Sequence, residues 1–251
     1  MKKLSAIVYV AVFLGFLWSC EQDTSQRGLP NNIDNRRDTE QKEENISWNL
    51  SEDELTVQST GQDPQTFAQM CMKTNIQIVL DCSGSMNEVV SGATKLASAK
   101  RALEVWVENL PDDVNLGFAT FYLSQQQQLV EIGPDQKQRV IDELKHIVAD
   151  GGTPLRSALE FGSSKLRQQW RKQLGYGQYQ LVVVTDGEAG FNQDPVDTMR
   201  SLASTPIELT TIGFGTGSGH SMNKPRLARF LVASNEEELT KQLAEIKPES
   251  D

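Results

Sequence analysis

Two groups of oxygen-bearing side chains follow apolar runs in this sequence. The stretch Asn75-Ile-Gln-Ile-Val-Leu-Asp81-Cys-Ser83-Gly-Ser85-Met86 leads an apolar strand pattern directly into an aspartate and two serines. The run Gln180-Leu-Val-Val-Val-Thr185 leads in the same way into Asp186. Carboxylates and hydroxyls are hard oxygen ligands, which suit a small hard cation better than a soft metal ion. The pattern therefore predicts a cation site that needs no Cys or His.

A third group, Gly151-Gly152-Thr153, lies in a loop that enters a predicted helix. In a doubly wound sheet the loops after the carboxyl ends of parallel strands share one rim, and loops that feed helices can open on the same rim. Two carboxylates and three hydroxyls can converge there, and we predict that they bind Mg²⁺, with Ca²⁺ and Mn²⁺ as alternative ions. The candidate ligands are Asp81, Ser83, Ser85, Thr153 and Asp186.

The folded part, predicted as residues 67–251, alternates strand patterns with helix patterns. Apolar residues in 96–110 recur at three- and four-residue steps and predict an amphipathic helix. Residues 114–121 and 129–132 predict an antiparallel hairpin at a sheet edge, with a Gln-rich turn between its strands. Two further helices follow, and Thr153-Pro154 is predicted as the N-cap and first residue of the second.

The run 180–185 is apolar without alternation, as expected for a parallel strand that is covered on both faces. Strand patterns recur at 207–213 and 229–232, and Asn235-x-x-Glu238 predicts a capped helix start. Repeated strand-then-helix units predict an α/β fold with a doubly wound, mostly parallel sheet, helices on both faces and one antiparallel edge strand.

At these residues the chain resembles the von Willebrand factor A domain family, with its metal-ion-dependent adhesion site. The resemblance runs from about Thr74 to Ile246, which is nearly the whole folded part. The matching motifs are Asp81-Cys-Ser83-Gly-Ser85-Met86 for the D-x-S-x-S element, Gly152-Thr153-Pro154-Leu155 for the threonine loop and Thr185-Asp186-Gly187 for the aspartate loop.

The resemblance implies a Rossmann-like fold and a division of labour among the ligands. Ser83, Ser85 and Thr153 are expected to offer hydroxyls to the ion, while Asp81 and Asp186 hold it largely through waters. Neutral hydroxyl ligands leave the charge of the ion only partly compensated, so a vacant position attracts a carboxylate of another protein. The expected function is therefore the binding of another protein through the metal ion.

One departure from the family concerns the C-terminal region. A typical member has a full helix after the glycine loop, whereas here Ser221-Met-Asn-Lys-Pro225-Arg-Leu leads almost at once into the strand pattern at 229–232. The penultimate helix is therefore expected to be shortened or lost. We predict a metal site without assigning an affinity switch to the last helix.

Each motif also has a simpler interpretation. Ser83 and Ser85 suit a turn after a strand, Thr153 suits a helix N-cap, and Asp186-Gly187 suits a plain turn. Their joint order on one α/β chain favours the metal site.

Other polar groups carry weaker signals. The glycine-rich loop 213–219 fits no phosphate-loop spacing and is interpreted as a flexible loop. His146 and His220 have no evident nucleophile or metal partner. Glu188 is predicted on the partner-binding rim, with a simply solvated side chain as the alternative. A solvated helix face is the interpretation of Lys95, Lys100 and Arg101.

The first residues predict export. Lys2 and Lys3 precede an apolar run that closes on Ser19-Cys20, which indicates a signal peptide over residues 1–19. Leu17-Trp18-Ser19-Cys20 is similar to a bacterial lipobox, so Cys20 is predicted to be lipidated, as by palmitate, and to anchor the chain in a membrane. An ordinary signal peptide or a short membrane anchor is the alternative.

Residues 20–66 are rich in Asn, Gln and acidic residues and predict a flexible tether. Within it, Ile46-Ser-Trp48-Asn-Leu50 alternates like a short strand, so docking of this piece on the domain is an alternative to full solvation. The formal charge of −10 argues against nucleic acid and against an electrostatic hold on anionic lipids. Cys71 and Cys82 flank a strand too long for a disulfide and are predicted as unpaired, buried thiols.

These features together predict a lipid-anchored protein of the bacterial cell envelope. Its A-type domain is expected to bind a protein partner through Mg²⁺ and an Asp or Glu carboxylate of that partner, and not to act as an enzyme. A metal-independent structural subunit of an envelope complex is the alternative. A hydrolase with Asp81 as nucleophile is a remote one, because no general acid or base is evident beside it.

Overall fold

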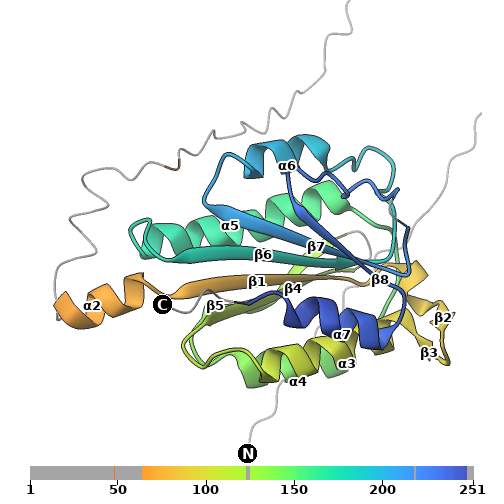
Figure 1. The fold of residues 1–251 in the computed structure, drawn as a ribbon, viewed down its shortest axis with the longest axis horizontal. Coiled ribbons are helices and arrows are strands. Elements are labelled where there is room, and N and C mark those ends of the chain that lie inside the picture. Colours follow the sequence, from red (N-terminus) through yellow and green to blue (C-terminus); the bar gives the residue numbers. More distant parts are fainter. Residues whose placement is uncertain (1–47, 49–63, 123–124, 218, 248–251) are drawn as a thin grey trace, which may run out of the picture. The chain divides into compact units, whose positions relative to one another are not determined.

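A six-stranded sheet forms the centre of the fold, and five of its strands run parallel (Figure 1). The structure is a computed structural model that describes residue 48 and residues 64–122, 125–217 and 219–247. The predicted signal peptide, Cys20 and most of the predicted tether lie outside the described residues. Within the described ranges, none of the helices has the length and apolarity that a membrane crossing requires.

The strands follow the order β5-β4-β1-β6-β7-β8, and only β5 is antiparallel to its neighbour. This arrangement confirms the predicted doubly wound α/β fold with one antiparallel edge strand. β1 and β6 are buried along almost their whole length, as their unalternating apolar sequences predict. The strands are β1 (Thr74–Asp81), β4 (Asn115–Tyr122), β5 (Gln125–Gly133), β6 (Gln178–Thr185), β7 (Ile207–Phe214) and β8 (Arg229–Ala233).

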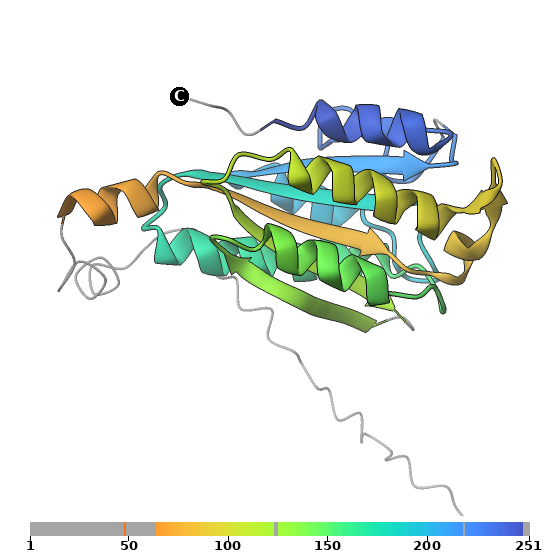
Figure 2. The same cartoon turned by 90° about the horizontal axis from the view of Figure 1, so that it is seen from below.

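Helices cover both faces of this sheet (Figures 1 and 2). α3 (Lys95–Glu108), α4 (Lys137–His146) and α7 (Glu236–Ala244) pack on one face, which Figure 2 shows from the front, and bury one hydrophobic core there. α5 (Leu155–Lys172) and α6 (Val196–Leu202) cover the other face and bury a second core. A further helix, α2 (Pro64–Cys71), precedes β1 and begins just before the predicted domain boundary.

Three details differ from the sequence predictions or add to them. The Gln-rich stretch is not a turn but the first half of β5, because an edge strand with one solvated face accepts alternating Gln residues. A small hairpin, β2 (Val89–Val90) with β3 (Ala93–Thr94), was not predicted and follows a short 3₁₀ turn, η1 (Gly84–Asn87). Its Ser91-Gly92 turn has positive φ at both residues, as a tight hairpin turn requires.

The C-terminal region agrees with the sequence. Among the described residues between β7 and β8 there is no helix, so the penultimate helix is missing as predicted. Asn235 caps α7 by accepting a hydrogen bond from the Glu238 backbone N–H at 2.9 Å. Cys71 and Cys82 are both free and buried, which confirms their prediction as unpaired thiols.

Trp48 contacts the domain even though it precedes it by many residues. Its ring meets Trp170 of α5 edge to face, with 5.3 Å between ring centroids, and packs at the margin of the α5 core. Such an aromatic pair contributes about 0.5–1.5 kcal/mol beyond the apolar area that it buries. For this residue the docked alternative is the correct one.

The close packing of α5 on the sheet generates a stability prediction. A Cβ on Gly162 would lie 2.6 Å from Cδ1 of Leu181 and 3.0 Å from Cγ2 of Val79. Gly162→Ala should therefore destabilise the domain by about 1–3 kcal/mol, although Ala favours a helix by about 1 kcal/mol over Gly. Chemical denaturation measures this, with the exposed Gln168→Ala of the same helix as a control expected to stay within about 0.5 kcal/mol. A Gly162→Ala domain as stable as wild type would contradict the packing.

Candidate metal centre

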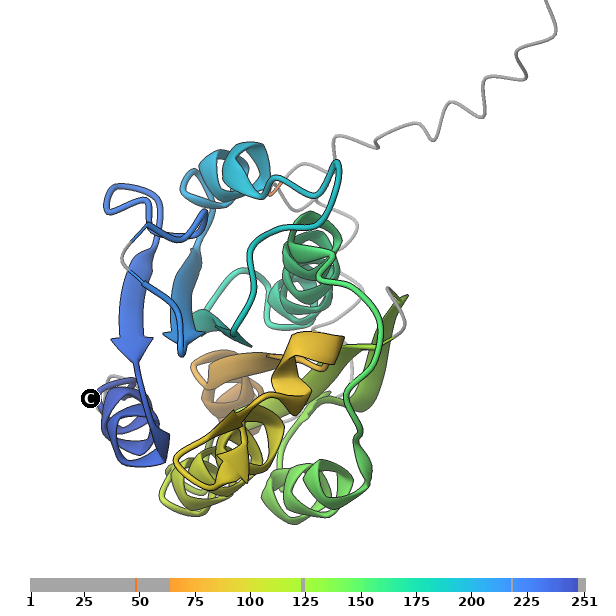
Figure 3. The ribbon, with the colours of Figure 1, turned by 90° about the vertical axis from the view of Figure 1, so that its right-hand side faces the viewer.

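Three loops meet at the rim formed by the carboxyl ends of the parallel strands, onto which Figure 3 looks. One leaves β1 after Asp81, one leaves β6 after Thr185, and the third connects α4 to α5 through Thr153. β1 and β6 are adjacent, while the chain reaches them from opposite halves of the sheet. This is the topological switch point, where a doubly wound sheet opens a crevice for ligands.

Backbone hydrogen bonds join the loop after β1 to the loop before α5. The Gly84 N–H donates to the Gly151 carbonyl at 2.9 Å, and the Asp150 N–H donates to the Cys82 carbonyl at 2.8 Å. The Asn87 side-chain amide adds a third bond, to the Ala149 carbonyl. Two segments far apart in sequence are therefore held in register.

The serine hydroxyls and Asp186 form one hydrogen-bonded row. Oγ of Ser83 lies 3.0 Å from Oγ of Ser85, and the Ser85 hydroxyl donates to Oδ1 of Asp186 at 2.7 Å. A Mg²⁺ ion with ligands at about 2.1 Å holds neighbouring octahedral ligands about 3.0 Å apart. The spacing of the two hydroxyl oxygens therefore fits two adjacent positions around a small divalent ion.

Both carboxylates are already occupied by protein donors on each oxygen. Asp81 accepts from the Ser83 N–H at 2.7 Å on Oδ1 and from the Thr185 hydroxyl at 2.6 Å on Oδ2. Asp186 accepts from Ser85 on Oδ1 and from Nζ of Lys95 at 2.8 Å on Oδ2. Carboxylates held in this way suit an outer position around an ion, with the hydroxyls nearer to it.

Thr153 joins this group without serving as the predicted helix cap. α5 begins at Leu155, its N-cap is Pro154, and no side chain caps it, so the N-cap prediction for Thr153 is wrong. The hydroxyl instead faces the aspartate loop, because a Cβ on Gly187 would lie 3.1 Å from Oγ1 of Thr153 and 3.6 Å from Oγ of Ser85. The simpler role proposed for Thr153 is thereby removed.

Lys95 is the functional residue that the sequence interpretation missed. It was predicted on a solvated helix face, yet only 8% of its side chain is exposed, and Nζ bonds Glu88 at 2.7 Å as well as Asp186. Burial lowers the pKa of Lys95, but the hydrogen bonds to Asp186 and Glu88 outweigh burial and raise it, so the ammonium stays charged. The sequence does contain a signal for this role, because Lys95 lies at the start of the predicted helix and therefore at the helix end beside the rim.

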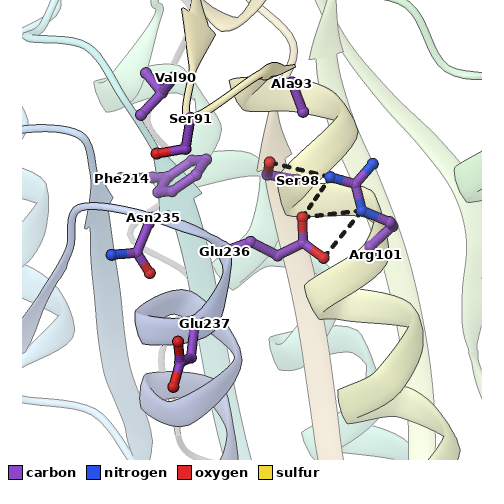
Figure 4. Close-up of a pocket in the computed structure, with 9 residues that line it drawn as sticks. All are labelled: Val90, Ser91, Ala93, Ser98, Arg101, Phe214, Asn235, Glu236 and Glu237. Atoms are coloured by element: carbon purple, nitrogen blue, oxygen red, sulfur yellow. Dashed lines mark hydrogen bonds and ion pairs between the residues drawn. The ribbon is translucent and has the colours of Figure 1, made fainter.

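Arg101, from the same predicted face, has a different partner. It is half exposed and its guanidinium bonds the Glu236 carboxylate, with Nε 2.9 Å from each oxygen. The pair joins α3 to α7 at the edge of a cavity of about 310 Å³, in which Figure 4 shows Arg101, Ser98 and Glu236 linked. None of the five predicted ligands lines this cavity.

His220 and Glu188 connect the aspartate loop to the loop after β7. His220 is buried, its Nε2 donates to the Gly187 carbonyl at 2.7 Å, and its Nδ1 accepts from the Met222 N–H at 3.1 Å. This pairing defines a neutral tautomer. Glu188 is exposed on the rim, as predicted, and accepts a hydrogen bond from the Ser221 N–H at 3.0 Å. Both side chains therefore hold the loop that carries Asp186.

Cys82 lies between the candidate ligands in sequence but not in space. Its side chain is fully buried in the core beneath the α3 face, and burial raises its pKa to about 12. A thiol that stays protonated is a poor metal ligand. Among the described residues, no three His, Cys, Asp or Glu side chains gather as a metal cluster, and three of the five predicted ligands are hydroxyls.

Burial also governs Asp81. Loss of solvent raises its pKa from the ordinary 3.8 to about 6, with Asp186 adding to the rise, although its hydrogen bonds from Ser83 and Thr185 oppose it. The site therefore carries an unfavourable negative charge at neutral pH, which a divalent cation would relieve. The residues present fit such an ion in ligand chemistry, spacing and charge.

Comparison with known proteins agrees with this arrangement. A family model described as "von Willebrand factor type A domain" matches residues 75–245, which is more than half of the chain. An uncharacterized protein of Bacillus subtilis (strain 168), YwmC, is 26% identical over 159 residues, which cover 58% of this chain and 68% of YwmC.

Two solved structures share the fold at low sequence identity. The pilus adhesin SpaC from Lactobacillus rhamnosus GG aligns with a TM-score of 0.56 and 15% identity, over 69% of this chain and 30% of SpaC. Proximal thread matrix protein 1 from the mussel byssus, whose structure has a zinc-occupied MIDAS motif, aligns with a TM-score of 0.53 and 18% identity, over 70% of this chain and 45% of its own. This chain thus spans less than half of either solved chain.

The raised pKa of Asp81 predicts how metal-free stability depends on pH. Between about pH 4 and pH 6 the folded state binds a proton at Asp81 that the unfolded state has released, so stability falls as pH rises. The loss contributed by Asp81 is on the order of 3 kcal/mol for a shift of this size. Denaturation in a chelator should show this slope in wild type and in the exposed control Asp113→Asn, but not in Asp81→Asn. Equal slopes in wild type and Asp81→Asn would contradict the assignment.

Proposed function

The chain belongs to the von Willebrand factor type A domain family, and on this premise we propose that it binds a protein partner through a Mg²⁺ ion bridged to a partner carboxylate. Ser83, Ser85 and Thr153 would hold the ion through hydroxyls, Asp186 orients the hydroxyl of Ser85, and both Asp81 and Asp186 would balance the charge of the ion. A bound Mg²⁺ supplies an open coordination position that attracts a carboxylate from the partner.

The distance between the two serine hydroxyls carries this proposal. Oγ of Ser83 and Oγ of Ser85 are 3.0 Å apart, which suits adjacent ligands of Mg²⁺. The Ser85 hydroxyl donates to Asp186, so Ser83 is the donor in the 3.0 Å contact, and one lone pair of the Ser85 oxygen stays available for an ion. Around neutral ligands the ion keeps most of its charge, and this makes it attractive to an incoming carboxylate.

Exposed apolar side chains near the centre favour a protein partner. Phe191 follows the aspartate loop and is 93% exposed, while Val89 in the hairpin and Val148 in the threonine loop are 68% and 60% exposed. Gly190, next to Phe191, donates a backbone hydrogen bond to the Thr153 carbonyl at 2.9 Å, which places this loop beside the site. Large apolar side chains around a polar centre are typical of protein–protein interaction sites.

A binding role fits the site better than an enzymatic one. Asp81, the conceivable nucleophile, is fully buried with both oxygens in hydrogen bonds. His220, a possible base at the rim, uses both ring nitrogens in bonds to the backbone. Neither group is placed to meet a substrate, because catalysis requires hydrogen-bond reach to the reacting atoms.

The proposed setting is the bacterial cell envelope. The predicted lipidation of Cys20 would anchor the chain in a membrane there. A pilus adhesin, SpaC, shares this fold, which is compatible with the proposed setting. A metal-independent structural role in an envelope complex is the second candidate, and the Lys95–Asp186 pair favours it, because it supplies a positive charge to the rim without an ion.

Metal affinity tests the ligand set. Isothermal titration of the chain with Mg²⁺ should show one site, and Ser83→Ala should weaken binding at least about tenfold because one of three hydroxyl ligands is lost. Asp81→Ala should weaken it further, since a buried charge is removed. Ser201→Ala, an exposed serine of α6, should bind like wild type. Equal affinity of wild type and Asp81→Ala would remove the site.

Partner capture tests the bridge. Crosslinking on intact cells followed by purification should recover a partner in Mg²⁺ and lose it in a chelator or with Ser83→Ala. Phe191→Ala should reduce recovery, because the removed ring is a contact for the partner, without changing the melting temperature. Tyr176→Ala, also exposed but next to β6 at the amino end of the strands, serves as the matched control. Recovery that survives the chelator would favour the structural role instead.

A further inference from the structure

Lys95 occupies a place where a lysine is disfavoured. It is the first residue of α3, and Thr94 caps this helix by accepting from the Ala97 N–H at 3.1 Å. The amino end of a helix carries partial positive charge, which repels a cation. Burial adds a second cost, since only 8% of the side chain is exposed. A lysine at such a position requires compensation by negative charge.

Two carboxylates, one buried and one exposed, compensate the positive charge of Lys95. Nζ lies 2.8 Å from Oδ2 of Asp186, whose side chain is fully buried, and 2.7 Å from Oε2 of Glu88, which is 65% exposed. Gly215 gives the lysine stem room, because a Cβ there would lie 3.1 Å from Cε. Gly215 also has a φ of +70°, so another residue at this position would be strained. The ammonium is thus held on the carboxylate that faces the metal centre.

We infer that Lys95 is an internal cation that offsets part of the negative charge of the centre when no divalent ion is bound and lowers the affinity of the centre for such an ion. The inference rests on the proposed function, because it concerns the same ion. Lys95 acts through Asp186 and is therefore a positioning residue, with no direct contact to the ion or the partner.

The charges of the side chains at the rim explain why Lys95 would lower the affinity for a divalent ion. Asp81 and Asp186 contribute two negative charges at the ends of adjacent strands, and Lys95 returns one positive charge. Asp186 shares its two oxygens between Lys95 and Ser85, so an ion near Ser85 lies close to the ammonium. Repulsion between these two cations is strong where water is excluded. Removing the lysine charge should strengthen ion binding and weaken the metal-free fold.

Glu88 acts in the opposite direction. It draws part of the ammonium charge away from Asp186 and adds a negative charge beside the centre. Its backbone carbonyl also accepts from the Lys95 N–H at 2.9 Å, so the side chain can be changed while the hairpin stays anchored. Removing this charge should weaken ion binding, which is the reverse of the effect of removing Lys95.

The test compares Lys95→Met and Glu88→Gln in the full chain. Mn²⁺ affinity is measured by titration with electron paramagnetic resonance, and melting temperature is measured in chelator and in Mg²⁺. Lys95→Met should bind Mn²⁺ at least about tenfold more tightly. It should also melt lower than wild type in chelator and gain more from Mg²⁺ than wild type does. Glu88→Gln should bind Mn²⁺ more weakly than wild type, and Lys95→Arg, which keeps the charge, should stay near wild type.

The outcomes separate this inference from the proposed function. A wild-type chain that binds no Mn²⁺ overturns both. A wild-type chain that binds while Lys95→Met binds equally or more weakly overturns the inference alone, as does a shift of both variants in the same direction. If Lys95→Met does not fold in chelator, recovery of its fold by Mg²⁺ supports the inference, and failure to recover at any Mg²⁺ concentration overturns it.

Discussion

The rim is organised around two buried carboxylates at the ends of adjacent strands. Asp81 ends β1 and Asp186 follows β6, and β1 and β6 are paired in parallel. Burial of a charged carboxylate is unfavourable, and loss of solvent is the main reason why the pKa of Asp81 is raised, with the charge of Asp186 adding to the rise. The loops at this rim must therefore supply donors or cations, and this requirement explains most of their contacts.

The donors are divided between the two carboxylates. Neutral donors, the Ser83 N–H and the Thr185 hydroxyl, bind Asp81, whereas Asp186 receives Lys95 together with Ser85. Since each carboxylate oxygen already accepts a hydrogen bond, the proposed ligands nearest to the ion are the hydroxyls of Ser83, Ser85 and Thr153. In the proposed function these neutral ligands would leave the ion enough charge to attract a partner carboxylate.

Much of this arrangement was predictable from the sequence. Polar residues that directly follow apolar strand patterns are expected at the carboxyl ends of parallel strands, and these ends lie on one edge of the sheet. The placement of Asp81, Ser83, Ser85 and Asp186 on one rim follows from that rule. Thr153 was predicted on the rim for the right reason, but its capping role was wrong because Pro154 shifts the start of α5 to Leu155. Their role as metal ligands remains a prediction.

Other features depend on tertiary contacts, which the hydrophobic periodicity of the sequence does not specify. Lys95 was grouped with Arg101 on a solvated helix face, yet Lys95 is the first residue of α3 and its ammonium bonds Asp186 at the rim. The hydrogen bond from His220 to Gly187 joins loops that only the fold brings together. The Ser91-Gly92 turn was a readable hairpin signal, whereas the strand role of the Gln residues in β5 came from pairing with β4.

The most direct test of the account is a crystal structure of the chain grown with Mn²⁺, with anomalous scattering used to locate the ion. We predict one anomalous peak at the rim, from an ion bound by the hydroxyl oxygens of Ser83, Ser85 and Thr153 at about 2.0–2.3 Å. Asp81 and Asp186 should lie close to the ion, and Nζ of Lys95 should keep its bond to Asp186. A rim without a peak at saturating Mn²⁺, or a peak held by other side chains, would contradict the central claim.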